Sequence, residues 1–257
     1  MSLSKPYYRL WRPLKGYSPL SEEWYEDSPR LSIQYLKDGR FACQAEMESL
    51  VTTAHLIIRD LYEVFDYIEP NDANLSVFSH RLYELFLRAA TEFETNCKGI
   101  LKANGYNKNW DNMYITDYCK IASVAKLPKY KVAFKRWATS REFKPFSIWE
   151  KNSNGSLVWY QNYNHVKHNR YKNFSKANFD NVMNAISGLL CILHAQIGKN
   201  MSRVSFEGIE MPQTSQELVD TGTFTIIAPS FPEDEQYDFI WDNIKEEPKP
   251  VNKYNFK

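Results

Sequence analysis

Apolar residues recur every three or four positions along three long stretches of the chain, which is the spacing of a helix with one buried face. The stretches are residues 41–69, which end before Pro70, residues 75–104, which end before Gly105, and residues 179–197, which end before Gly198. Ser175 is the expected N-terminal cap of the last stretch. The pattern predicts three long amphipathic helices that pack against one another.

Weaker patterns fill the rest of the chain. Residues 115–126 and 157–170 predict shorter helices, the second with Trp159, Tyr163 and Val166 inward. Residues 129–149 predict a hairpin or an irregular excursion, and residues 223–228 a short strand. The fold class that follows is all-α, a four- to five-helix bundle with a small β or irregular excursion. We expect an N-terminal arm over residues 1–40, the bundle over 41–200 and an acidic C-terminal extension over 201–257.

A net charge of +1 hides two segments of opposite sign. Residues 126–176 hold twelve Lys and Arg against two Glu, whereas residues 207–247 hold eleven Asp and Glu against one Lys. The basic segment suggests an anionic partner, and we expect the acidic one to dock onto it and mask it.

Four scattered cysteines indicate free thiols in a reducing, cytoplasmic setting. No apolar run is long enough for a membrane span, and the N-terminus lacks the apolar core of a signal peptide.

The common nucleotide-binding, hydrolase and zinc motifs do not occur in the sequence. His165 and His168 have the spacing of two ligands on one helical face, but zinc needs a third and usually a fourth. We therefore expect no metal site and no cofactor.

One cluster has the chemistry for phosphodiester work. Asn164, Lys167, His168 and Tyr171 fall at i, i+3, i+4 and i+7, which places them on one helical face, and Arg170 is close by. His168 can move a proton, Lys167 and Arg170 can hold a phosphate, and Asn164 can orient the substrate. A ribose 2′-hydroxyl would then be the internal nucleophile. The alternative interpretation is a solvated basic face in which His168 is a cap or packing residue.

Eleven aromatic residues alternate with the cations of residues 126–176. Exposed rings would stack unpaired bases while the cations follow the phosphates; alternatively, most rings belong to the core. The candidate substrate-binding residues are Lys172, Tyr171, His165 and Arg88. In the predicted helix 75–104, Arg88 lies four positions from Glu84 and from Glu92, the spacing of ion pairs on a helix surface. If this helix is adjacent to the one over 157–170, a carboxylate such as Glu92 or Glu94 would orient His168.

Two segments resemble the HEPN superfamily of bacterial all-α domains. They are residues 82–101, LYELFLRAATEFETNCKGIL, and residues 159–174, WYQNYNHVKHNRYKNF, which contain a YNxVKHxR turn before a late helix. The resemblance covers roughly residues 41–200. It implies a metal-independent ribonuclease of toxin–antitoxin or phage-defence type that acts as a dimer, although some members only bind. The hallmark of the family is an arginine followed after four to six residues by a histidine; here the order is reversed, His165 before Arg170.

These observations lead to two functional hypotheses. The first is an RNA-directed HEPN-like protein and, in its stronger form, a metal-independent ribonuclease of bacterial defence or stress response. Its partners would be single-stranded RNA and a second copy of the chain in a homodimer. The alternative is a non-catalytic interaction or dimerisation module regulated by its acidic tail. The sequence leaves open whether the protein is an enzyme.

Overall fold

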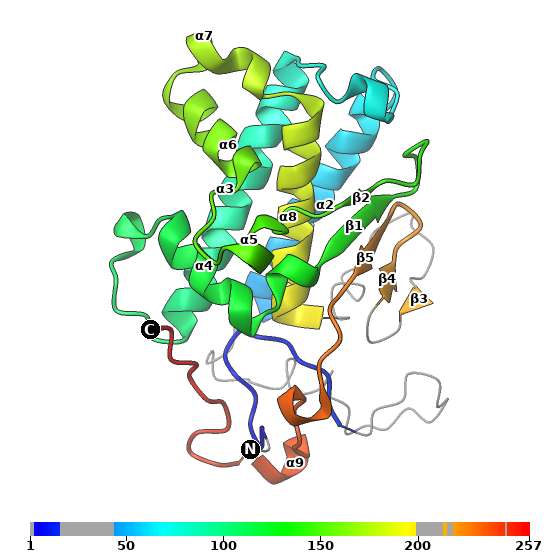
Figure 1. The fold of residues 1–257 in the computed structure, drawn as a ribbon. Helices are drawn as coiled ribbons and strands as arrows, with labels where there is room; N and C mark the ends of the chain where they lie inside the picture. Colours follow the sequence, from blue (N-terminus) through cyan, green and yellow to red (C-terminus); the bar gives the residue numbers. More distant parts are fainter. Residues whose placement is uncertain (1–2, 16–43, 199–212, 215–217, 245) are drawn as a thin grey trace.

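The computed structural model describes residues 3–15, 44–198, 213–214, 218–244 and 246–257 (Figure 1). The protein is mainly helical, with one small antiparallel sheet. Most of the predicted N-terminal arm, Cys43, and the acidic residues Glu207, Glu210 and Glu217 lie outside the described residues.

Helix α8 (Phe179–Ile197) is the central element, because all of its residues except Asp180 and Asn184 are buried. It packs against α2 (Gln44–Val64), α3 (His80–Ala103) and α6 (Val158–His168) (Figure 1). The predicted cap is wrong: the side chain of Asn178 accepts from the backbone amide of Asn181, while Ser175 lies in the preceding 3-10 turn η4 (Phe174–Lys176). Asn178 caps the helix because it directly precedes the first helical residue and has an extended backbone, from which its side chain reaches the free amide of the first turn.

The other two long helices lie where the apolar pattern predicts them. α2 ends at Val64, before the predicted end at residue 69, and α3 lies within the predicted range 75–104. α3 starts after Ser79, whose hydroxyl caps the amide of Leu82, and its C-terminus is followed by Gly105 at φ 81. The shorter elements are η1 (Asp72–Asn74), η2 (Trp110–Asn112), α4 (Ile115–Val124), η3 (Leu127–Lys129), α5 (Ile148–Lys151), α7 (Arg170–Asn173), η6 (Glu233–Glu235) and α9 (Trp241–Ile244).

The sheet joins the predicted excursion to the C-terminal part of the chain. Its strands are β1 (Lys131–Phe134), β2 (Glu142–Phe143), β3 (Gln213–Thr214), β4 (Leu218–Asp220) and β5 (Phe224–Ile227), in the order β2-β1-β5-β4-β3. Val132 pairs with Ile226, and both side chains are buried in the same core as the helices. The predicted fold class is confirmed in its coarse form, because the fold is mainly helical with a small β element. Residues on both sides of position 200 share one sheet and one core.

Residues 3–15 and 237–252 run beside each other at the C-terminal end of α8. The Tyr237 amide donates to the carbonyl of Pro13 at 2.9 Å, and the Asn252 amide donates to that of Pro6 at 2.8 Å. Arg9 is buried, and its Nε donates to Gln196 of α8 at 2.7 Å. This end of the molecule is therefore built from both chain ends.

Three further findings bear on the predictions from composition. Within the described ranges, no helix is both long and apolar enough to cross a membrane. Across the same residues, no group of three or more His, Cys, Asp or Glu side chains is arranged to hold a metal ion. Cys97, Cys119 and Cys191 are buried free thiols, as predicted.

Candidate nucleic-acid interface

Most of the aromatic residues between positions 126 and 176 belong to the core. Nine of the eleven rings are buried: Tyr130, Phe134, Trp137, Phe143, Phe146, Trp149, Trp159, Tyr160 and Tyr163. Phe93 of α3, for example, lies 5.6 Å from Phe146 and 5.3 Å from Trp159 between ring centroids. The interpretation of these nine rings as a base-stacking surface is wrong. Phe174 is half-buried, and Tyr171 is 96% exposed.

Most cations of the same segment already have carboxylate partners. Ion pairs join Lys126 to Glu235, Lys129 to Glu150, Lys131 and Lys144 to Glu142, Lys135 to Asp220, Arg136 to Asp66, Arg141 to Asp72 and Lys167 to Glu94. Among the described residues, no carboxylate lies within ion-pair distance of Arg170, Lys172, Lys176 or Lys151. Three of these four follow α6 directly, so the uncompensated charge is concentrated there.

The chain bends sharply between α6 and α7. α6 ends at His168, and Asn169, at φ −150 and ψ 77, caps α7 by accepting from the amide of Lys172 at 3.2 Å. Asn173 holds the bend by donating to the carbonyls of His165 and Asn169. The prediction of one continuous helical face that includes Tyr171 is therefore wrong. The amide side chains compete with the helix for the backbone groups at this point.

Lys167 is directed toward α3. Its ammonium donates to the Tyr163 hydroxyl at 3.0 Å and lies 3.8 Å from a carboxylate oxygen of Glu94. The Tyr160 hydroxyl donates to the other oxygen of Glu94 at 2.5 Å. Partial burial lowers the pKa of Lys167, but the hydrogen bond to Tyr163 and the charge of Glu94 outweigh it and raise the pKa. A carboxylate from α3 does face this turn, but its partner is Lys167 rather than His168.

The half-buried ring of Phe174 joins α7 to the start of α3. Its centroid lies 5.6 Å from Phe78, 4.8 Å from His80 and 6.0 Å from Tyr83, and the guanidinium of Arg170 lies 5.6 Å from the centroid of Tyr83. Phe78 is 48% exposed. Residue spacing alone does not place Phe78, His80 or Tyr83 near the site; the local feature that could have indicated it is an aromatic residue beside the start of the second long helix.

We define the α7 surface as the exposed end of the molecule formed by His165, His168, Arg170, Tyr171, Lys172, Lys176 and the rings of Phe78, His80, Tyr83 and Phe174. The ammonium of Lys176 donates to Nδ1 of His165 at 2.8 Å. His168 is exposed, and within the described parts of the chain no hydrogen bond or ion pair to its side chain is found. Asn164 is half-buried on the preceding turn. Of the proposed catalytic residues, His168 and Arg170 are on this surface, while Lys167 lies beside it.

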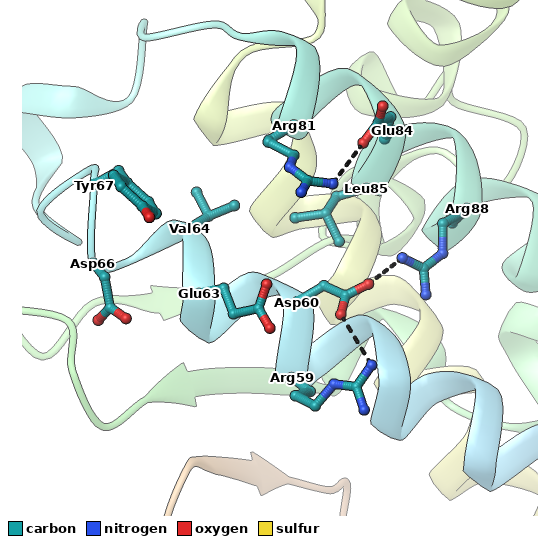
Figure 2. Close-up of a pocket in the computed structure, with 10 residues that line it drawn as sticks. All are labelled: Arg59, Asp60, Glu63, Val64, Asp66, Tyr67, Arg81, Glu84, Leu85 and Arg88. Atoms are coloured by element: carbon teal, nitrogen blue, oxygen red, sulfur yellow. Dashed lines mark hydrogen bonds and ion pairs between the residues drawn. The ribbon is translucent and has the colours of Figure 1, made fainter.

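Arg88, a predicted substrate-binding residue, is not part of the α7 surface. It forms an ion pair with Asp60 of α2, not with Glu84 or Glu92 as its spacing suggested. Figure 2 shows this pair in a cavity of about 670 Å³ between α2 and α3. The cavity is lined by Arg59, Asp60, Glu63, Val64, Asp66, Tyr67, Arg81, Glu84, Leu85 and Arg88. Because four carboxylates face three guanidinium groups, the lining does not favour a polyanion.

The described acidic residues of the C-terminal part lie elsewhere. Glu235 pairs with Lys126 and Arg12, Asp220 with Lys135, Asp238 with Lys15, and Glu247 with Lys5. Figure 1 places α9 and the N-terminal segment at one end of the molecule and α7 at the other. Two of these ion pairs, of Glu235 with Lys126 and of Asp220 with Lys135, join the acidic part to the basic segment as expected, and the others neutralise the N-terminal segment. Among the described residues, none of these ion pairs involves the α7 surface.

No protein-family model, curated protein or solved structure matches this chain. The resemblance to the HEPN superfamily therefore stays a prediction.

Proposed function

We propose that this protein binds single-stranded RNA through the α7 surface. The observation that carries the proposal is the coincidence of Arg170, Lys172 and Lys176, which lack carboxylate partners within the described residues, with the 96% exposed ring of Tyr171. Cations of this kind track a phosphate backbone, and an exposed ring stacks an unpaired base. A strand with splayed bases suits the surface better than a duplex, whose bases are already stacked.

The salt dependence of binding follows from the number of free cations. Each cation that neutralises a phosphate of a single strand releases about 0.7 counterion, so Arg170, Lys172 and Lys176 together give a slope of about −2 in log affinity against log salt. Lys167 adds less, because it is already compensated by Glu94. A slope near zero would contradict the proposal.

The binding experiment is fluorescence anisotropy with a short labelled RNA in low salt. We expect Arg170→Ala/Lys172→Ala to weaken binding about tenfold or more and to flatten the salt slope, and Tyr171→Ala to lose about 1–3 kcal/mol of binding free energy. Two variants serve as matched controls. Tyr67→Ala removes a ring that lines the cavity between α2 and α3 and is 90% exposed to solvent, and Lys151→Ala removes a cation that has no carboxylate partner in the described structure. Equal effects of the α7 variants and the controls would refute a specific surface.

The stronger form of the proposal is metal-independent cleavage of the bound RNA. His168 would accept the proton of a ribose 2′-hydroxyl, whose oxygen attacks the adjacent phosphorus. The bond from phosphorus to the 5′-oxygen breaks, the 5′-oxygen takes a proton from water, and a 2′,3′-cyclic phosphate remains. Arg170 would contact the phosphate, and Asn164 would orient the substrate. Lys167 would first have to leave Tyr163 and Glu94. What supports this form is the exposure of His165 and His168 beside Arg170 on one surface.

Cleavage is tested on a labelled single-stranded RNA pool in excess chelator, with wild type beside a His168→Ala protein of verified fold. Cleavage by wild type alone would place His168 in a metal-independent site. Cleavage by both would exclude His168 as the proton-transfer group. Absence of cleavage by either, with binding intact, would reduce the function to RNA binding, and absence of both activities would favour the interaction-module alternative.

A further inference from the structure

A second group of exposed rings and lysines lies at the opposite end of α3 from the α7 surface. Trp110 is 39% exposed and Tyr114 is 58% exposed, and both belong to the segment between α3 and α4. The ammonium of Lys98 lies 5.8 Å from the centroid of Trp110, and that of Lys108 lies 5.2 Å from the centroid of Tyr114. We call the group of Lys98, Lys102, Lys108, Trp110, Tyr114 and Lys120 the α3–α4 corner.

Lysines outnumber carboxylates at the α3–α4 corner. Only two carboxylates occur in residues 98–120, and one of them, Asp117, is buried and paired with Lys108 at 2.7 Å. The other, Asp111, is exposed. Within the described structure no ion pair joins an Asp or Glu side chain to Lys98, Lys102 or Lys120, although Lys102 donates to the backbone carbonyl of Tyr106 and Lys120 to the backbone oxygen of Lys257. The corner therefore combines exposed rings with lysines, of which Lys98 and Lys102 have no carboxylate partner in the described structure.

The outward face of α3 connects the two surfaces. Four polar residues recur on it at intervals of three and four, which places them on one side of the helix: Thr91, Thr95, Lys98 and Lys102. Thr91 and Lys102 are exposed, and Thr95 and Lys98 are half-buried. Thr91 lies 3.3 Å from the Tyr163 hydroxyl that holds Lys167. Lys98 is one turn beyond Glu94, the partner of Lys167, which corresponds to a rise of about 6 Å. Charged or hydroxyl-bearing side chains thus continue from α7 to the corner.

We propose that single-stranded RNA bound at the α7 surface continues along this face of α3 to the α3–α4 corner, where Trp110 and Tyr114 stack bases and Lys98 and Lys102 contact the backbone. The inference rests on the proposed RNA binding and adds a second contact to it. The 24 residues of α3 span about 36 Å, so only a strand of several nucleotides reaches both surfaces. The α2–α3 cavity lies toward the N-terminal turns of α3, where Glu84 and Arg88 line it, and its four carboxylates against three guanidinium groups do not favour a nucleic-acid strand.

The test is a length series of labelled oligouridine, from about 4 to about 16 nucleotides, the range of site sizes common for single-strand binders. Wild-type affinity should rise with length and then level off once the strand reaches the corner. Trp110→Ala/Tyr114→Ala should bind the shortest oligomer as wild type does and the longest about tenfold more weakly. Tyr67→Ala, the matched exposed ring, should follow wild type at every length. Lys98→Glu/Lys102→Glu, which removes no ring, should also lose the gain with length.

The outcomes separate this inference from the proposed function. If the α7 variants weaken the short oligomer while both corner variants bind every length like wild type, the second contact is refuted and RNA binding at α7 stands. If wild type binds no oligomer at all, both are refuted. If the ring variant is unfolded by circular dichroism, the charge-reversal variant decides, and unchanged affinity for the longest strand in that variant overturns the inference.

Discussion

Asp117 holds the segment that presents the rings of the α3–α4 corner, and its replacement should destabilise the protein measurably. Its carboxylate accepts hydrogen bonds from the Tyr106 hydroxyl at 2.8 Å, the Lys108 ammonium at 2.7 Å and the Tyr114 amide at 2.8 Å. The Asp117 side chain is almost completely buried, whereas that of Lys108 is partly exposed. Removing the carboxylate would leave a hydroxyl and an amide without their acceptor.

The expected size follows from these contacts. A hydrogen bond to a charged group contributes roughly 1.5–3 kcal/mol and a helix N-terminal cap about 1 kcal/mol, and the three bonds share one carboxylate, so they are not additive. Solvent screens the contribution of Lys108. We expect Asp117→Ala to lower the free energy of unfolding by about 3 kcal/mol, and Asp117→Asn by about 1 kcal/mol because its amide oxygen can still accept from Tyr114.

The effect should depend on pH in one direction. Burial raises the pKa of Asp117, but the hydrogen bonds from Lys108, Tyr114 and Tyr106 outweigh it, so the pKa in the folded protein lies below its usual value. The stabilisation is therefore present above the unfolded pKa of about 3.9 and is lost as the pH falls through the folded pKa.

Urea unfolding of wild type, Asp117→Ala and Asp117→Asn at a series of pH values measures both features. Asp111→Ala, a nearby exposed carboxylate, is the matched control and should change stability by less than about 0.5 kcal/mol. The reasoning is refuted if Asp117→Ala behaves like Asp111→Ala at neutral pH. A stability difference that stays constant into strong acid would also refute it.

Three further predictions concern the fold around the site. Glu94→Gln should lower the free energy of unfolding by about 1–2 kcal/mol, because it removes the charge that faces Lys167 while leaving an acceptor for Tyr160; equal urea midpoints would contradict this. Phe93→Ala should destabilise by about 3–5 kcal/mol, because Phe93 is fully buried among aromatic rings; calorimetry checks it, and a loss below about 1 kcal/mol would show that the site refills. Phe224→Ala should cost a similar amount, because this strand residue is fully buried in the common core; an unaffected melting temperature would mean that the C-terminal sheet is not coupled to the helices.

The long helices were predictable because their signal is local. A stripe of apolar residues at helical spacing has to face a core whatever the rest of the chain does, and α2, α3 and α8 follow their stripes. The same reasoning placed Trp159, Tyr163 and Val166 inward, and all three are buried. The boundary between α6 and α7 was missed, because the side chain of Asn169 caps a new helix where the apolar spacing alone allowed the old one to continue.

The candidate site was only partly predictable. The sequence pointed to His165, His168, Arg170, Tyr171 and Lys172, and the structure gathers these at one exposed end. The sequence could not show that Phe78, His80 and Tyr83, nearly a hundred residues earlier in the chain, surround the ring of Phe174. Nor could residue spacing show that most neighbouring rings are core, because an aromatic side chain suits a buried position and an exposed stacking position equally well.

The sequence by itself determined where the three long helices lie, that α3 and α8 stop before a glycine, and which segments carry an excess of one charge. Only the tertiary structure decided which charges remain free. Lys135 and Asp220 are 85 positions apart and pair across the sheet, and Arg88 is directed to Asp60 on another helix, whereas Arg170 and Lys172 have no described carboxylate partner. Periodicity is a property of neighbouring residues along one element, but charge compensation and ring burial depend on contacts between elements that are far apart in the chain.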